Sequence, residues 1–297
     1  MSAVIETEAV GKRYGRLWAL SDCTLSIPAG HVVGLVGPNA AGKTTLLNLA
    51  TGMVAPTAGT IVVLGGRPAG GPAQLAKVGY LAQHAPVYAG LSVADHLALG
   101  AHLNPGWDAE LARRRIERLD LNLEQKAGSL SGGQRAQLAL TLAVAKRPAV
   151  LILDEPVASL DPLARREFLK DLMEAVAEQG LSVVLSSHLI SDLERVCDYL
   201  IVLVASRVRV AGSVEELLET HHLLSGPRRD PDTLPAGQAV ISASHTDRQS
   251  TLLVRSTDEI LDPAWTAAEV GLEDLVLAYL NQAAAGDSHN HRGEPLN

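Results

Sequence analysis

Cysteine, net positive charge and long apolar runs are all scarce in this chain of 297 residues. Its two cysteines, Cys23 and Cys197, lie far apart and in no metal-binding spacing, which indicates a reducing compartment without a disulfide framework. Lysine and arginine total 25 against 33 aspartates and glutamates, a formal net charge of −8. This acidic balance argues against a broad nucleic-acid footprint, which needs a basic face. We therefore expect a cytoplasmic protein with no nucleic-acid partner.

No stretch of the sequence has the character of a membrane helix, which needs about 20 mostly apolar residues. The longest uncharged stretches, 23–42 and 44–66, are interrupted by prolines, glycines and an asparagine. The opening residues, MSAVIETEAV, contain two glutamates and no basic stretch leading into an apolar one, so no signal peptide is visible. Any role at a membrane is expected to depend on a partner protein.

What the chain does have is an alternation of short β-rich runs with longer amphipathic segments. The runs are HVVGLVG, TIVVLG, AVLILDEP, LSVVLSSH and YLIVLVA. This order is typical of an α/β domain with a buried, largely parallel sheet. Between 162 and 179, apolar residues recur at helical spacing after Pro162, and Gly180 follows as a stop signal. The sequence therefore predicts a helix over 162–179.

We expect the main domain to cover residues 3–218. Strand signals disappear between about 84 and 147, which predicts a helical insertion in the α/β core. Residues 219–236 are rich in proline, glycine and charge and are expected to form a linker. A small accessory domain is expected over 237–284 and a disordered tail over 285–297.

The accessory domain has a simple pattern of its own. QAVISAS and STLLVRS could form a small antiparallel unit, closed by a helix at about 266–283. In the tail, His289 and His291 form too small a cluster to indicate a metal site.

A glycine-rich loop lies between an apolar run and a helical segment. GPNAAGKTT follows HVVGLV and precedes a helical pattern, and in this context G-x-x-x-x-G-K-[ST] indicates a phosphate loop. Its backbone N–H groups and helix terminus would hold phosphates, Lys43 would add charge, and the Thr44 hydroxyl would bind Mg²⁺. An ordinary turn with a solvated lysine is the alternative. The expected ATP-binding residues of the loop are Gly37, Pro38, Asn39, Ala40, Ala41, Gly42, Lys43, Thr44 and Thr45.

Two adjacent acids end the buried run VLILDEP. Groups at the carboxyl end of a parallel strand face the ligand crevice. Asp154 is expected to hold Mg²⁺, directly or through water, and Glu155 to polarise the attacking water. Two acids that only mark an exposed strand end are the alternative.

A second glycine-rich run, LSGGQR, has no lysine and no preceding strand. Together with the phosphate loop and the paired acids, it closely resembles the nucleotide-binding subunit of ATP-binding cassette (ABC) transporters over about residues 3–218. The resemblance implies an ABC-type phosphate-loop NTPase core: a mostly parallel sheet, an antiparallel β portion and a helical subdomain. Residues 219–297 would then add a small α+β extension. The matching signature residues are Leu130, Ser131, Gly132, Gly133 and Gln134.

The resemblance assigns four further residues, each with a plainer alternative. Tyr14 resembles the aromatic on which adenine stacks, although it could simply be exposed. Gln83 resembles the Q-loop glutamine, which reaches the metal or the attacking water, or it could be a polar strand-end residue. Asp161 resembles the D-loop aspartate and is also a credible helix N-cap. His188 resembles the switch histidine, which would hold Glu155 and water in line, whereas most lone histidines are structural.

A complete site implies two chains. One chain supplies Lys43 and Glu155 but no evident donor for the far side of the γ-phosphate. The resemblance supplies it from the signature of a second chain, so that each ATP lies between residues 37–44 of one chain and Ser131 to Gln134 of the other. We expect a homodimer, or a pair with a similar ATPase subunit. Two departures from the family pattern stand out: Ala40 replaces a frequent glycine, and Gln137 replaces a common basic residue.

The resemblance predicts an ATPase motor subunit, peripheral on the cytoplasmic face of the membrane beneath separate permease subunits. GLEDLVLAYL near the C-terminus resembles the ending of ATPases in bacterial multi-component exporters, which favours export. A soluble ABC ATPase of translation or DNA maintenance is the alternative. However, the chain has one cassette rather than two, and residues 45–129 contain no long coiled coil or zinc module. The basic run RRRIER, 113–118, could contact nucleic acid, but a solvated helix face is preferred.

Overall fold

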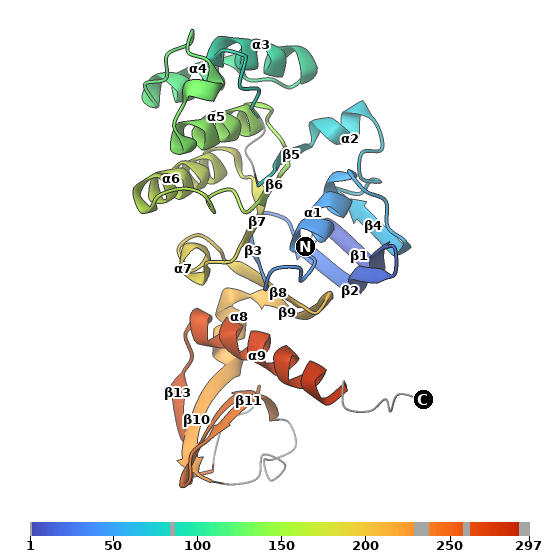
Figure 1. The fold of residues 1–297 in the computed structure, drawn as a ribbon, viewed down its shortest axis with the longest axis vertical. Coiled ribbons are helices and arrows are strands. Elements are labelled where there is room, and N and C mark those ends of the chain that lie inside the picture. Colours follow the sequence, from blue (N-terminus) through green and yellow to red (C-terminus); the bar gives the residue numbers. More distant parts are fainter. Residues whose placement is uncertain (1, 84–86, 229–237, 258–261, 291–297) are drawn as a thin grey trace.

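A six-stranded sheet forms the centre of the molecule in the computed structural model, which describes residues 2–83, 87–228, 238–257 and 262–290, with 283–290 as backbone alone (Figure 1). In spatial order its strands are β5 (Val78–Leu81), β6 (Val150–Asp154), β7 (Ser182–Ser187), β3 (Val32–Val36), β8 (Tyr199–Val204) and β9 (Arg207–Ser213). All neighbours pair in parallel except β8 and β9. β3, β6 and β7 are buried along their whole length, which explains their continuous apolar sequences.

An antiparallel sheet covers one side of this centre. Its order is β2 (Leu17–Pro28), β1 (Ala3–Tyr14) and β4 (Ala58–Val63). Alternate residues of the central strands, such as Val33 and Leu35, share a buried apolar cluster with β1, β2 and helix α1 (Lys43–Thr51). The short helix α2 (Pro72–Ala76) leads into β5. The predicted antiparallel portion is confirmed.

The helical subdomain lies at the end of the molecule farthest from the C-terminal sheet (Figure 1). It contains α3 (Val93–Leu103), α4 (Ala109–Arg118), a short 3-10 helix (Ala127–Ser129) and α5 (Gly132–Ala145). Within the described part of the insertion, 87–147, no strand joins either neighbouring sheet. The core continues with α6 (Pro162–Gln179), α7 (Ile190–Leu193) and α8 (Val214–Thr220). None of the helices in the described ranges is long and apolar enough to cross a membrane.

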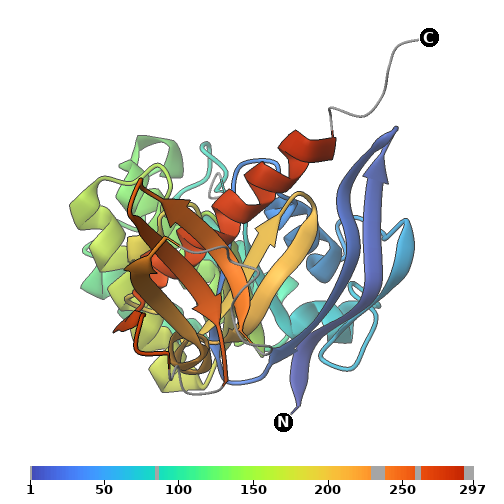
Figure 2. The ribbon, with the colours of Figure 1, turned by 90° about the horizontal axis from the view of Figure 1, so that it is seen from below.

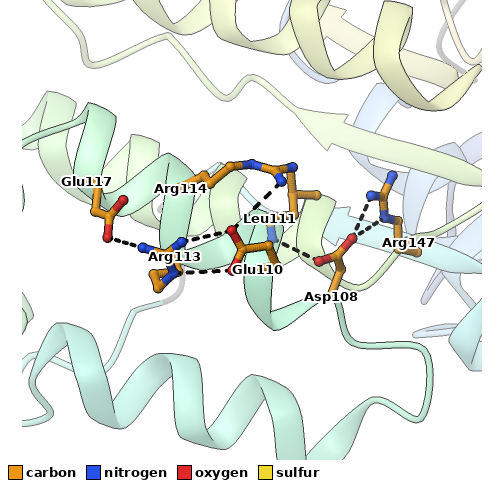
Figure 3. A network of polar contacts seen from close by, with 7 residues as sticks. All are labelled: Asp108, Glu110, Leu111, Arg113, Arg114, Glu117 and Arg147. Atoms are coloured by element: carbon orange, nitrogen blue, oxygen red, sulfur yellow. Dashed lines mark hydrogen bonds and ion pairs between the residues drawn. The ribbon is translucent and has the colours of Figure 1, made fainter.

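Ion pairs occupy much of the basic run on α4. Figure 3 shows Arg113 between Glu110 and Glu117 on the same helix, with 2.8 Å between Arg113 Nη2 and Glu110 Oε1. Arg118 reaches α6, where its Nη2 lies 2.7 Å from Asp171 Oδ1. Exposed pairs of this kind contribute about 0–1 kcal/mol each to stability. The run therefore forms a charged helix surface and part of the junction between α4 and α6.

The C-terminal unit is a four-stranded antiparallel sheet with one helix. Its strand order is β11 (Ala239–His245), β12 (Gln249–Arg255), β10 (His221–Pro227) and β13 (Thr266–Glu269). Helix α9 (Leu272–Asn290) contacts β11 and also β8 of the central sheet, and Figure 2, seen from below, shows it running diagonally behind the C-terminal strands. The predicted α+β extension is confirmed, and the two strands expected in it do pair.

Three details of that extension differ from the prediction. Residues 221–227 were expected in a linker, but β10 pairs with both β12 and β13 and places the buried Leu224 in the core of the unit. Residues 266–269 form β13 rather than the start of the closing helix. That helix continues to residue 290, into the expected disordered tail. The prolines and glycines of 226–235 are typical of a linker, so the strand that ends at residue 227 was not predicted. Residues 229–237 and 291–297 lie outside the described residues.

A buried histidine joins the C-terminal unit to the core. His221 is fully buried where α8 meets β10, and its Nδ1 donates to the carbonyl of Leu217 at 2.7 Å. Its Nε2 accepts a hydrogen bond from the Tyr279 hydroxyl on α9 at 2.8 Å. Burial lowers the pKa of His221 below its ordinary value. The neutral ring is thus one of the polar contacts that hold α9.

Acidification should weaken this attachment. Because the pKa of His221 is lower in the folded chain than in the unfolded one, the unfolded chain takes up the proton first as pH falls. The contribution of His221 to the free energy of unfolding is complete when the pH is well above the ordinary histidine pKa of about 6.5. It is lost as the pH falls through that value toward the lower pKa of the folded chain. We expect a lower urea midpoint at pH 5.5 than at pH 7.5, read from Trp265 after Trp18 and Trp107 are replaced by Phe. His221→Gln should reduce this pH dependence and His222→Gln should keep it; an equal pH dependence in both variants would contradict the role of His221.

Candidate functional site

The order of the central strands brings four loops to one edge of the sheet. Gln83 follows β5, Glu155 follows β6, His188 follows β7, and the glycine-rich loop follows β3. Since these strands are parallel neighbours in the order β5, β6, β7, β3, their carboxyl ends lie side by side. The sheet thereby brings together residues that lie far apart in the sequence, from Gly37 to His188.

The loop between β3 and α1 requires glycine at two positions. A Cβ on Gly37 would lie 2.1 Å from the carbonyl oxygen of Leu203, and one on Gly42 would lie 2.4 Å from that of Ala19. Gly42 also has a φ of 106°, in the left-handed region. Ala40 takes a φ of 65°, at a cost of about 1 kcal/mol that glycine would avoid. The alanine at position 40, where the family often has glycine, is therefore tolerated at the cost of local backbone strain, and the loop still forms.

The ammonium group of Lys43 lies inside this loop. Lys43 is only 5% exposed, and its Nζ donates to the carbonyls of Gly37 at 2.7 Å and Pro38 at 3.3 Å. Its Nζ also lies 3.5 Å from Glu155 Oε1. The solvated-lysine alternative does not describe this side chain. A buried cation at the start of a helix, next to loop N–H groups, is an arrangement suited to binding phosphate.

Glu155 connects this cation to the neighbouring strand end. Its carboxylate accepts a hydrogen bond from His188 Nδ1 at 3.0 Å. Its backbone has a φ of 46°, and its N–H donates to Ser186 Oγ at 2.9 Å. Lys43, Glu155 and His188 therefore form one line of polar contacts across the ends of β3, β6 and β7.

Ser186 is a site residue that the sequence analysis missed. Its hydroxyl donates to Asp154 Oδ1 at 2.8 Å while accepting from the Glu155 N–H. Ser186 is fully buried and Asp154 is 2% exposed, so this bond lies in a region of low dielectric. The available signal was a pair of serines at the end of the apolar run SVVLSSH.

A hollow of about 560 Å³ opens above these contacts. It brings together most of the predicted ATP-binding residues, and it is lined by Tyr14, Ala19, Asn39, Ala40, Ala41, Gly42, Lys43, Thr44, Thr45, Gln83 and Glu155. Tyr14 is half exposed at its rim, with Lys12 Nζ 5.3 Å from the ring centroid. Gly37 and Pro38 do not line the hollow, and their carbonyls accept hydrogen bonds from Lys43 instead. Asp154 is buried beneath the lining of the hollow. The Asp154 carboxylate and the Thr44 hydroxyl fit Mg²⁺. Proteins usually hold this ion by one or two carboxylates, while water and phosphate oxygens complete its coordination shell.

The signature residues are arranged around the start of α5. Leu130 is buried in the helical subdomain, whereas Ser131, Gly132 and Gln134 are exposed. Ser131 Oγ accepts from Gln134 N at 3.1 Å, and Gln134 Oε1 accepts from Ser131 N at 2.9 Å, a reciprocal capping box. None of residues 130–134, all within the described part of the chain, lines the hollow.

Asp161 and Gln137 have local structural roles. Asp161 Oδ1 accepts from the N–H groups of Leu163 and Ala164, both at 3.0 Å, so it is the N-cap of α6. Gln137 is buried in α5, and its Oε1 has no hydrogen-bond partner among the described residues. The departure noted at Gln137 thus concerns the interior of the helical subdomain rather than its charged surface.

Comparison with known proteins identifies the family. The family described as ABC transporter matches residues 20–158. The thiamine import ATP-binding protein ThiQ of Salmonella choleraesuis is 34% identical over 202 residues, which are 66% of this chain and 85% of ThiQ. The chain belongs to the ABC transporter ATP-binding family.

Other relatives agree with this assignment. The sulfate/thiosulfate import ATP-binding protein CysA of Brucella melitensis is 34% identical over 224 residues, which are 72% of this ABC protein. The match spans 62% of CysA, so this chain covers less than two thirds of that relative. A solved ATP-binding subunit of an ABC transporter superposes with a TM-score of 0.65 at 28% identity, over 72% of this chain and 91% of that one. The structure of CbiO1 of Clostridium perfringens superposes with a TM-score of 0.64 at 25% identity, over 73% of this chain and 91% of that one.

Removing the Ser186 hydroxyl should impair turnover more than nucleotide binding. Ser186→Ala would leave Asp154 without its buried donor and the Glu155 N–H without its acceptor. Loss of such supporting contacts typically costs about 10- to 100-fold in metal affinity or activity. We expect kcat for ATP hydrolysis to fall about tenfold or more, with ADP affinity changed little. Ser182→Ala, at the opposite end of β7, is the matched control; equal losses in both variants would show that only strand stability was affected.

Proposed function

We propose that this chain is the ATP-hydrolysing motor subunit of a multi-component ABC transporter. The observation that carries the proposal is the line of contacts from Lys43 through Glu155 to His188 within the hollow. It places a buried cation, a carboxylate and an imidazole at one strand edge, the set that phosphoryl transfer to water requires. The transport relatives support the coupling of hydrolysis to transport rather than to translation or DNA maintenance.

ATP binding is assigned to the loop and to Tyr14. The backbone of residues 37–45 and Lys43 would hold the β- and γ-phosphates, because loop N–H groups and the terminus of α1 favour negative charge. Adenine would stack on Tyr14 at the rim of the hollow, a contact worth roughly 1–3 kcal/mol. When bound with ATP, Mg²⁺ would neutralise charge on the phosphate oxygens. Thr44, Asp154 and Gln83 are the residues that would hold it.

Water activation is assigned to Glu155. Its carboxylate would accept the hydrogen bond that orients the attacking water, and His188 would fix the carboxylate through the 3.0 Å contact. Phosphoryl transfer depends mainly on positioning and on preorganised charge. Glu155 is already held on both sides before it acts, by Lys43 and by His188.

A second chain would complete the site. The exposed start of α5, Ser131 to Gln134, presents N–H groups and the positive end of a helix dipole, and none of these residues lines the hollow of its own chain. In a head-to-tail pair this terminus would face the γ-phosphate bound by the other chain, with Asp161 near the shared boundary. The partner is a second copy or a similar ATPase subunit.

Separate membrane subunits are the proposed site of transport. The motor would be cytoplasmic and peripheral on the cytoplasmic face of the membrane, with its helical subdomain and the Gln83 loop toward the permease subunits. The direction of transport has opposing indications. The segment 271–280, which forms the first turns of α9, resembles exporter ATPases, whereas CysA and ThiQ are named as import proteins. We retain export as a proposal that rests on 271–280 alone, and cargo accumulation in inside-out vesicles would support it whereas accumulation in right-side-out vesicles would contradict it.

Neutralising Glu155 should separate binding from hydrolysis. Glu155→Gln removes the carboxylate that activates water but leaves the loop and Lys43 in place. We expect ATP affinity to be retained, hydrolysis to fall at least about 100-fold, and a nucleotide-bound dimer to accumulate at saturating MgATP. Light scattering coupled to size exclusion measures the mass.

The matched control is Glu178→Gln, which makes the same charge change at an exposed position on α6. It should hydrolyse ATP like the unmodified chain. A Glu155→Gln chain that stays monomeric at saturating MgATP would argue against the shared site.

A further inference from the structure

A second hollow, of about 350 Å³, lies between α6 and α7, away from the ATP site. Both helices follow residues of the proposed site: α6 begins directly after Asp161, and α7 begins two residues after His188 (Figure 1). None of the predicted site residues lines this hollow. Nothing in the proposed reaction uses it.

The charged lining of this hollow is predominantly basic. Arg165, Arg166 and Lys170 come from α6 and Arg195 from the turn after α7, and Asp192 is the acidic residue among them. Within the described residues, neither Arg166 nor Arg195 has a carboxylate within 4.0 Å, although Lys170 Nζ lies 3.8 Å from Glu174. The hollow therefore has an excess of positive charge even when Glu174 is counted with it.

The polar groups at its base are incompletely paired. Arg165 Nε and Asp192 Oδ2 are 3.7 Å apart, which is an ion-pair distance but too long for a hydrogen bond. Both atoms are buried and have no hydrogen-bond partner among the described residues. Asp192 is 7% exposed, and burial raises the pKa of its carboxyl despite Arg165 and Arg195. A buried guanidinium N–H usually has an acceptor, so the unpaired Arg165 Nε points to a ligand that supplies one.

The remaining lining is apolar. Leu169, Met173 and Val196 contribute hydrocarbon surface beside the cations. Guanidinium groups match carboxylate and phosphate groups by paired N–H donors, and they do so most strongly where apolar surface excludes water. The lining thus combines recognition of a compact negative group with room for a short apolar portion.

We propose that this hollow binds a small organic anion, with its phosphate or carboxylate group held by Arg165, Arg166 and Arg195 and its apolar portion against Leu169, Met173 and Val196. The anion bridges α6 and α7, and so joins the helices that follow Asp161 and His188. Asp192 opposes it by charge, because it lies beside Arg165 at the base. The site goes beyond the proposed ATPase and needs no hydrolysis to be detected.

The test is calorimetric titration of the full chain saturated with ADP, so that the phosphate loop is already occupied. Inorganic phosphate and malonate are the probes, and they separate a phosphate-binding site from a carboxylate-binding one. We expect saturable binding of at least one probe. Arg195→Ala should weaken it about tenfold, the effect of losing a charge-assisted contact.

Two further variants make the result specific. Asp192→Asn should tighten binding, because it removes the opposing charge with little change of shape. Arg209→Ala removes an exposed arginine on β9, outside the hollow, and should leave binding unchanged. The proposal is overturned if neither probe binds, or if Arg195→Ala and Arg209→Ala bind alike.

Discussion

A buried ammonium group sets the geometry of this protein's site. Lys43 has little access to water, so its charge must be balanced by nearby oxygen atoms. Two of them are carbonyls of its own loop, and the third belongs to Glu155 at the end of β6, two strands away from β3 in the sheet. The loop can curl this tightly only because Gly37 has no Cβ to meet the Leu203 carbonyl. The buried parallel strands beneath it keep Glu155 in reach.

The residues proposed to act on the nucleotide lie in two separate places. The strand edge holds Lys43, Glu155 and His188 in contact, whereas Ser131 lies at an exposed helix start in the helical subdomain. Ser131 and Gln134 cap each other and leave that terminus ordered. A terminus that is ordered in this way, and that does not line its own hollow, is suited to another chain's nucleotide. Asp161 is the N-cap that fixes the start of α6.

Sequence reasoning succeeded where local patterns are strong. The run VLILD, the loop around Lys43 and the helix from Pro162 each have a signal within a few residues, and each forms as expected. It failed at β10, because pairing with β12 and β13 outweighs the turn-forming residues of 226–235. It also missed Ser186, whose role depends on two neighbours that only the sheet brings to it. Local chemistry is written in the sequence, while contacts between strands depend on register.

The central claim is that one working site needs two chains, and mixing two inactive variants tests it most directly. Lys43→Ala removes the phosphate-binding cation of the loop and leaves the signature intact. Ser131→Arg disrupts the signature and leaves the loop intact. Mixed dimers would then contain one complete site, formed by the loop of one chain and the signature of the other. Random pairing predicts recovery of about a quarter of the unmodified ATPase rate, since half the dimers are mixed and each has one of two sites intact. A mixture no more active than its separate components would contradict the account.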